Sequence, residues 1–166
     1  MGTLIGRGAH ALDIAATLDP EWRQVTHHRD FTNEMCHQPF IIGVNDPRER
    51  FRIAEELLTV RWDEPWVHPS ATIGPRCEWG PGTHINYAVS MTRTTLGRHI
   101  TISPGVTICG DVVIDDNTLI GAGTTICDRV RIGRDCTIGA GTIILPETVV
   151  GDGETWVGNP GRRIKP

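Results

Sequence analysis

Large apolar residues recur at every sixth position of this chain from residue 67 onward. Only 39% of all residues are hydrophobic, so chance would give an unbroken series of this length about once in a few million sequences. One step is irregular, because Met91 and Leu96 in "AVSMTRTTLGRHITISPG" are five residues apart. The series consists of Val67, Ile73, Trp79, Ile85, Met91, Leu96, Ile102, Ile108, Ile114, Ile120, Ile126, Ile132, Ile138, Ile144, Val150 and Trp156.

The residues between these apolar positions indicate how the chain folds around the period. The fourth residue after each apolar one is small or β-branched, and Gly, Asp and Asn fill segments such as "IGAGTT" and "IDDNTL", where the chain must turn sharply. A six-residue period with such turns predicts a parallel β-helix, in which each hexapeptide gives one short strand and equivalent side chains stack in columns. An α-helix is excluded because six is not a multiple of 3.6 and because Gly and Pro recur inside the series.

A different pattern precedes the repeats. Strands are expected at 3–5, 23–26 and 40–44, with a glycine loop at 6–8 that leads into a helix from about Ala9. A second helix is expected in "NDPRERFRIAEELL", where Asp46 is a suitable N-cap, Pro47 fits the first turn and Glu49 completes a capping box.

This order of elements predicts a small α/β, Rossmann-like domain at 1–62, followed by the β-helix at 63–166. A glycine loop after a first strand allows anionic groups to approach a helix N-terminus, although a tight turn without a ligand explains the same residues.

Charge and cysteine content narrow the possible partners. A formal net charge of -4 and a pI near 5.9 argue against electrostatic binding to nucleic acid or to an anionic membrane, so a small-molecule partner is expected. The chain has an odd number of cysteines, no CxxC spacing, no secretory segment and no apolar run of membrane-spanning length. We therefore expect a reduced, cytoplasmic protein in which cysteines serve as small apolar residues. They are Cys36, Cys77, Cys109, Cys127 and Cys136.

The repeats and the closing "VGNPGRRIKP" resemble the hexapeptide-repeat acyltransferases. That resemblance implies a left-handed β-helix with three strands per coil, about five coils in all, and a homotrimer as the active unit. With "IGRGAH" and "IIGVND" in the domain ahead of the repeats, the chain is similar to the family of sialic acid O-acetyltransferases and bacillosamine-pathway N-acetyltransferases. In that family the first domain holds a nucleotide sugar and the β-helix holds acetyl-CoA.

The resemblance assigns binding roles by position. Along the β-helix, Gly110, Ala122 and Ala140 would line the acetyl-CoA groove, with Arg162 and Arg163 near its phosphates. The acidic residue usual after the second strand has no clean counterpart, although "VTHHRDF" offers Asp30. The residues that would contact the nucleotide sugar are Gly6, Arg7, Gly8, His10, Gly43 and Asn45.

The irregular step falls where this family carries its general base. The base is a histidine in a hexapeptide of the type I-x-H-x-C-x, and a second histidine ends the next hexapeptide. Here the two places read "MTRTT" and "LGRHIT", so Thr92 or Arg93 takes the first position, Thr101 takes the second, and both histidines are absent. A positioned general base accelerates the reaction by about 10²- to 10⁴-fold, and a hydroxyl acceptor needs this acceleration more than a neutral amine does. An amino-sugar acceptor is therefore favoured, with O-acetylation as the alternative.

Three other side chains are candidates for the chemistry. His84 follows Trp79 by five residues, as Thr101 follows Leu96, so His84 should stack one coil before Thr101 on the same corner. His99 lies in a turn two residues before Thr101. The guanidinium of Arg93 cannot act as a base, but it can bind phosphate or stabilise an oxyanion. For each of the three, a solvated surface residue is the alternative interpretation.

The sequence therefore favours a homotrimeric, acetyl-CoA-dependent N-acetyltransferase that acts on a nucleotide-linked amino sugar by direct attack on the thioester and needs no metal. Two alternatives stay open. One is a β-helix that has lost catalysis and serves in binding or assembly. The other is a zinc hydratase of the carbonic anhydrase type, although the spacing of His68, His84 and His99 does not suggest one shared site.

Overall fold

The computed structural model describes residues 3–5, 14, 16, 23–25, 40–42, 46, 48–49, 52–53 and 65–165. In the first part of the chain, strands β1 (Thr3–Ile5), β2 (Arg23–Val25) and β3 (Phe40–Ile42) form a parallel sheet of order β2-β1-β3. Thr3 lies opposite both Arg23 and Phe40 in this sheet. All three predicted strands are confirmed, the second and third ending one and two residues earlier than expected.

Helical residues occur where both helices are predicted. Ile14 is helical and buried, and residues 48, 49, 52 and 53 are helical as well. The Asp46 carboxylate accepts a hydrogen bond from the amide of Arg48 at 2.9 Å, as expected of an N-cap. Glu49 pairs with Arg52 at 2.6 Å, and its part in a capping box stays a prediction. None of the helices in the described residues is long and apolar enough to cross a membrane.

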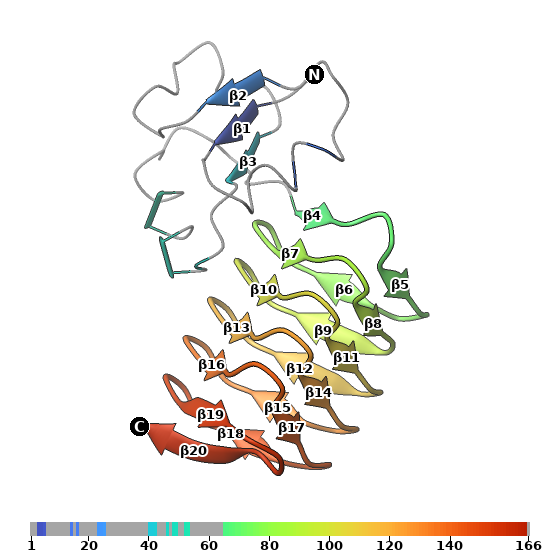
Figure 1. Ribbon diagram of the computed structural model, residues 1–166, viewed down its shortest axis with the longest axis vertical. Helices are drawn as coiled ribbons and strands as arrows, with labels where there is room; N and C mark the ends of the chain where they lie inside the picture. The colour runs from blue at the N-terminus through green and yellow to red at the C-terminus, as the bar shows by residue number, and fades with distance from the viewer. Residues whose placement is uncertain are drawn as a thin grey trace.

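From residue 66 onward the chain winds into a triangular β-helix with three flat faces (Figure 1). All pairing within it is parallel except that of β20 with β19, so the predicted β-helix with about five coils is confirmed. The first face contains β4 (Trp66–Val67), β7 (His84–Ile85), β10 (Thr101–Ile102), β13 (Leu119–Ile120), β16 (Thr137–Ile138), β19 (Thr155–Val157) and β20 (Arg162–Lys165). The second contains β5 (Thr72–Ile73), β8 (Ser90–Met91), β11 (Thr107–Ile108), β14 (Thr125–Ile126) and β17 (Ile143–Ile144). The third contains β6 (Glu78–Trp79), β9 (Thr94–Leu96), β12 (Val112–Ile114), β15 (Arg131–Ile132) and β18 (Val149–Val150).

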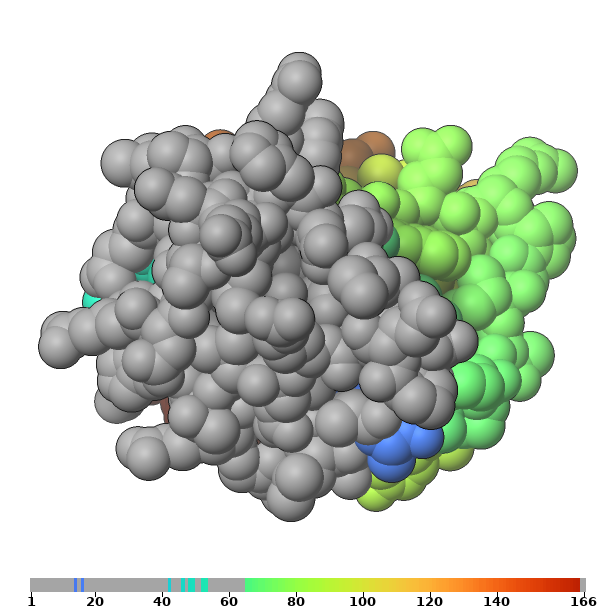
Figure 2. All heavy atoms as spheres, turned by 90° about the horizontal axis from the view of Figure 1, so that it is seen from above, coloured from blue at the N-terminus to red at the C-terminus, as the bar shows by residue number. Residues whose placement is uncertain are grey.

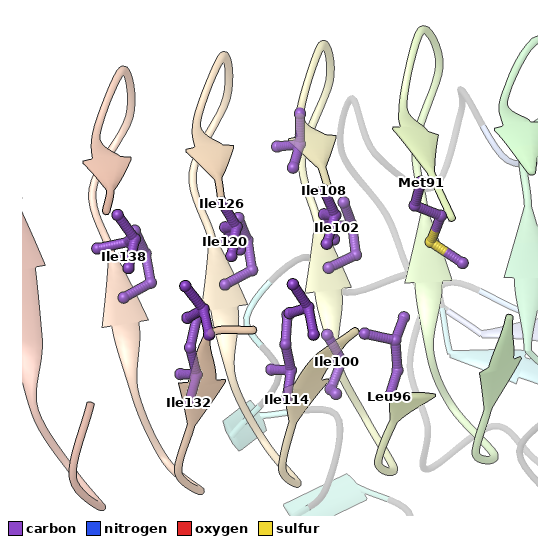
Figure 3. Packing of buried hydrophobic residues seen from close by; sticks show 14 of the residues in the cluster. Met91, Leu96, Ile100, Ile102, Ile108, Ile114, Ile120, Ile126, Ile132 and Ile138 are labelled. Atoms are coloured by element: carbon purple, nitrogen blue, oxygen red, sulfur yellow. The ribbon is translucent and has the colours of Figure 1, made fainter. Parts of the chain in front are cut away.

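The sixth-residue series forms the core. Ile102, Ile120 and Ile138 are fully buried in register on the first face, and isoleucines from the other two faces meet them inside the prism (Figure 3). The small or β-branched position also points inward, and several of its hydroxyls bond to the next coil. The Thr118 hydroxyl donates to the carbonyl of Gly133 at 2.9 Å, and that of Thr124 to the carbonyl of Gly139 at 3.0 Å.

Each coil turns at three corners. We call the corner between the first and second faces corner 1, that between the second and third corner 2, and that between the third and first corner 3. At corners 2 and 3, opposite charges stack from coil to coil. At corner 3, Arg98 pairs with Asp116 at 2.9 Å, and at corner 2, Arg129 pairs with Glu147 at 2.8 Å. The corners are thus held in register by contacts between side chains as well as by the strands.

Replacing Ile126 with Ala should destabilise the β-helix strongly, since the side chain is fully buried and the stacked coils leave no space to collapse. We expect a loss of about 2–5 kcal/mol in the free energy of unfolding, measured by urea denaturation. Thr125→Ala, at the neighbouring outward position, should cost less than about 1 kcal/mol. Equal losses in the two variants would contradict the inward register.

The corner 3 ladder predicts a pH dependence. Burial raises the pKa of Asp116, but the amide and guanidinium of Arg98, with Arg134 nearby, outweigh it and hold that pKa below its ordinary value of 3.8. Asp116 therefore contributes stability that is present above the unfolded-state pKa and is lost as the pH falls through the folded-state pKa. Wild type should melt at a higher temperature than Asp116→Asn at pH 7, and the difference should disappear below about pH 3. A difference that persisted in acid would contradict the ion-pair origin.

Candidate functional site

The structure locates the residue that the irregular coil lacks. Met91 pairs with Ile108 and Leu96 with Ile114, so four residues connect positions that are joined by five in the next coil. Thr94 pairs with Val112, and the residues directly before them, Arg93 and Asp111, both adopt a left-handed φ, 46° and 61°. Arg93 therefore stands in the place of Asp111.

It follows that Thr92 stands in the place of Cys109 and that the position held by Gly110 has no counterpart in the earlier coil. That position is the second after the apolar residue, where the motif I-x-H-x-C-x carries its histidine. The structure shows no counterpart of Gly110 between Thr92 and Arg93, and the assignment of either residue to the base position stays a prediction.

The Arg93 side chain fills the space that this shortening leaves. Its Nε donates to Asp111 Oδ1 at 3.2 Å, and its Nη2 lies so close to Gly110 that a Cβ there would overlap it. The side chain of Arg93 is nevertheless 41% exposed. A guanidinium thus faces solvent at corner 2, and Gly110 is buried beneath it.

Corner 1 carries a column of outermost residues that are mostly small. Hydrogen bonds from the following residue of the next coil define the stacking: Gly105 to the Tyr87 carbonyl at 3.1 Å, Gly123 to that of Pro104 at 3.0 Å, and Gly141 to that of Ala122 at 2.8 Å. Ala122 and Ala140 are both exposed, and a Cβ on Gly123 or Gly141 would meet nothing within 4 Å. We call the succession of Tyr87, Pro104, Ala122 and Ala140 the corner 1 column.

The two predicted phosphate-binding arginines lie beyond the last coil. Arg162 pairs with Val157, whose side chain packs over Gly139, so Arg162 stands at the carboxyl-terminal end of corner 1 and is exposed. Arg163 instead pairs with Glu154 at 2.7 Å. Hydrogen bonds from Arg163 and Trp156 lower the pKa of Glu154 despite some desolvation, which keeps this carboxylate charged and Arg163 engaged. The structure therefore brings Ala122, Ala140 and Arg162 together, but Gly110 lies at another corner.

His84 is the outward residue of β7 and pairs with Thr101 of the next coil, as predicted. Its side chain is nonetheless 0% exposed, and its ring makes an edge-on contact with Trp66 at 6.0 Å between centroids. His99 is 7% exposed at corner 3, in a left-handed conformation with φ of 54°. The alternative interpretation of both as solvated turn histidines is therefore wrong.

Sequence reasoning missed a group of rings on the first two coils. The His68 ring contacts Trp66 at 5.8 Å and Tyr87 at 5.9 Å, both edge-on, and its Nδ1 accepts the amide of Ser70 at 3.1 Å. Tyr87 is 47% exposed. It is the single tyrosine of the chain and takes a corner position that holds Pro or Ala in later coils, which is the signal that could have identified it.

The candidate residues thus occupy three regions of the β-helix. His84 and Tyr87 lie in one coil near corner 1, Arg93 lies at corner 2, and His99 at corner 3. No three His, Cys, Asp or Glu side chains in the described part of the chain gather so that they could hold a metal ion. The candidates Gly6, Arg7, Gly8, His10, Asp30, Gly43 and Asn45 lie outside the described residues.

A hydrogen bond joins the two parts of the chain. The Arg48 guanidinium, in the helical segment ahead of the repeats, donates to the Asp135 carbonyl at corner 3 at 2.6 Å.

Comparison with known proteins finds the same architecture. The acetyltransferase domain of PglB from Neisseria gonorrhoeae, in complex with acetyl coenzyme A, superposes with a TM-score of 0.75 at 18% identity, covering 98% of each chain. PerB from Caulobacter crescentus, in complex with CoA and GDP-perosamine, gives 0.75 at 18% identity over 99% of this chain and 98% of that one. WeeI from Acinetobacter baumannii gives 0.67 at 15% identity over 98% of each. No curated protein matches the sequence significantly.

These likenesses extend over nearly the whole chain, so they include the part ahead of the repeats as well as the β-helix. The family described as bacterial transferase hexapeptide (six repeats) matches residues 93–128, which begin at Arg93 in the shortened coil. The sequence match and the β-helical fold together confirm the predicted resemblance. Residues 93–128 thus match the bacterial transferase hexapeptide family, and the chain shares its β-helical fold with these acetyltransferase structures.

Proposed function

We propose that this chain is an acetyl-CoA-dependent N-acetyltransferase that acts on a nucleotide-linked amino sugar in the cytoplasm. Residues 1–62 would bind the acceptor and residues 63–166 acetyl-CoA. The observation that carries the proposal is the corner 1 column, where exposed Ala122 and Ala140 lead to the exposed Arg162. The fold supports it, since it is shared over nearly the whole chain with proteins crystallised with acetyl coenzyme A and with CoA and GDP-perosamine.

The corner 1 column suits a coenzyme A arm physically. Glycine turns with open space beside them expose backbone amides and carbonyls, which can bond to the two amides of pantetheine. The exposed Arg162 guanidinium at the end of the column can bind phosphate oxygens in a bidentate manner.

The chemistry follows from the missing position. In the proposed reaction a neutral amine attacks the thioester carbonyl, the C–N bond forms, the C–S bond breaks, and coenzyme A leaves as the thiolate while the amine loses a proton. An amine reaches this transition state by positioning alone more readily than a hydroxyl does. His84 is the candidate to accept the proton, and Arg93 is the candidate to stabilise the oxyanion or bind an anionic group.

His84 and Arg93 lie on different sides of the prism, so a single site that uses both requires two subunits. We therefore propose a homotrimer in which the corner 2 of one subunit faces the His84 region of its neighbour. Closed cyclic symmetry would repeat that site at each of the three interfaces.

Release of coenzyme A thiol from acetyl-CoA should be detected with nucleotide-linked amino sugars and not with their hydroxyl counterparts. His84→Ala should lower kcat by about 10²-fold or more if the imidazole accepts the proton. Circular dichroism and acetyl-CoA affinity must stay at wild-type values, since this residue is buried. Turnover of hydroxyl acceptors alone would contradict the amine argument, and an unchanged rate in His84→Ala would remove this residue as the base.

Co-expression of His84→Ala and Arg93→Ala chains tests the shared site. Each variant alone should be slow, whereas randomly mixed trimers should recover about a quarter of the wild-type sites, because one interface in four then combines an intact His84 with an intact Arg93. Light scattering measures the mass of the oligomer. A mixture as slow as its components would show that the two residues do not share an intersubunit site.

One observation favours a second candidate function, a β-helix that binds acetyl-CoA without catalysis. The coil of Arg93 lacks the position where the resembling family carries its base, while the core around it is intact. Calorimetric binding of acetyl-CoA without thiol release across the whole acceptor panel would support this candidate over the transferase.

A further inference from the structure

Tyr87 differs from every other member of the corner 1 column. The residues that follow it in later coils are Pro104, Ala122 and Ala140, so the column is small from Ala122 toward the carboxyl-terminal end and bulky at its amino-terminal end. The Tyr87 side chain is 47% exposed and therefore stands at the surface of the corner. Side chains of the first coils, in green, are visible at this end of the β-helix in Figure 2.

Two further rings support the Tyr87 ring on its amino-terminal side. His68 contacts it edge-on at 5.9 Å, and Trp66, which is 3% exposed, contacts His68 in turn at 5.8 Å. Ser70 ties the two coils together, since its hydroxyl lies 2.9 Å from His68 Nδ1 and accepts the amide of Ala88 at 3.2 Å. The rings of His68 and Trp66 and a hydrogen-bonded corner thus limit movement of Tyr87 toward the amino-terminal end.

The positive charge at the carboxyl-terminal end of the corner 1 column sets the direction in which coenzyme A would lie along it. Arg162 lies on β20, beyond the last coil at corner 1, five strand spacings from the Tyr87 level, which at about 4.8 Å each makes about 24 Å. An extended pantetheine arm together with the pyrophosphate of coenzyme A, met by the long side chain of Arg162, covers a comparable distance. If the phosphates of coenzyme A bind at Arg162, the thioester reaches the level of Tyr87.

We infer that Tyr87 is a specificity-determining residue that limits the length of the acyl group. The inference rests on the proposed function, because it requires coenzyme A to bind along the corner 1 column. With its thioester at the level of Tyr87, an acetyl group ends before the ring, whereas a longer acyl chain meets the fixed wall of Tyr87, His68 and Trp66. When a site discriminates against one extra methylene in this way, kcat/KM changes by about 10- to 200-fold.

The test compares acetyl-, butyryl- and hexanoyl-CoA with one amino-sugar acceptor. Wild type should prefer acetyl- over hexanoyl-CoA by at least about tenfold in kcat/KM, and Tyr87→Ala should reduce that preference by at least about tenfold. Tyr87→Phe keeps the ring and should keep the preference. Val149→Ala removes another exposed apolar side chain, 69% exposed and located on the third face, and should leave the preference unchanged.

Calorimetry without acceptor separates this inference from the proposed function. Wild type should bind acetyl-CoA more tightly than hexanoyl-CoA, with the difference reduced in Tyr87→Ala and the affinity for coenzyme A itself unchanged. Turnover with an unaltered chain-length preference in Tyr87→Ala would overturn the role of Tyr87 alone. No affinity for coenzyme A in the wild type would overturn both the inference and the proposed function.

Discussion

Register between stacked coils is the constraint on which the rest of this structure depends. Equivalent isoleucines lie above one another inside the prism, and burial of each one depends on its neighbours in the coils before and after. The same register aligns the corners, because each corner is a fixed number of residues from a buried position. The corner 1 column and the charged ladders of corners 2 and 3 are therefore consequences of the core, and a site built along a corner inherits the rigidity of the stack.

The shortened coil shows where such a stack accepts a deletion. Met91 and Leu96 remain in the core at 2% and 4% exposure, and Thr94 takes the inward position that Val112 holds in the next coil. The Thr94 hydroxyl is satisfied by the Thr92 carbonyl at 3.0 Å. The missing position thus lies at corner 2, and neither the buried series nor the strand pairing is interrupted by its absence. A change that costs the core so little can alter the chemistry of the corner without loss of the fold.

The sequence predicted the structural features that follow the six-residue period, and it did not predict those that depart from it. Inward positions such as Ile102 and Ile120 follow a six-residue period, so the three faces, the coil number and the pairing of His84 with Thr101 were all predictable. The place of the missing residue near Arg93 was not predictable from the sequence. The apolar series defines only the two ends of that hexapeptide, and the left-handed φ of Arg93 decides the alignment between them. The burial of His84 was also not predictable from the sequence. Outward positions of strands are exposed on average, and only tertiary contacts can bury such a side chain.

A cation at corner 2 fits amine chemistry better than hydroxyl chemistry. In the proposed intersubunit site, a positive charge close to the acceptor amine disfavours its protonated form and so lowers its pKa. The neutral amine, which is the nucleophile, would then be populated without a dedicated base. The same guanidinium becomes more favourable as the thioester oxygen gains negative charge, so it assists before and during the transition state. Asp111 restrains Arg93 at 3.2 Å and partly neutralises it, which leaves the guanidinium oriented yet 41% exposed to an incoming ligand.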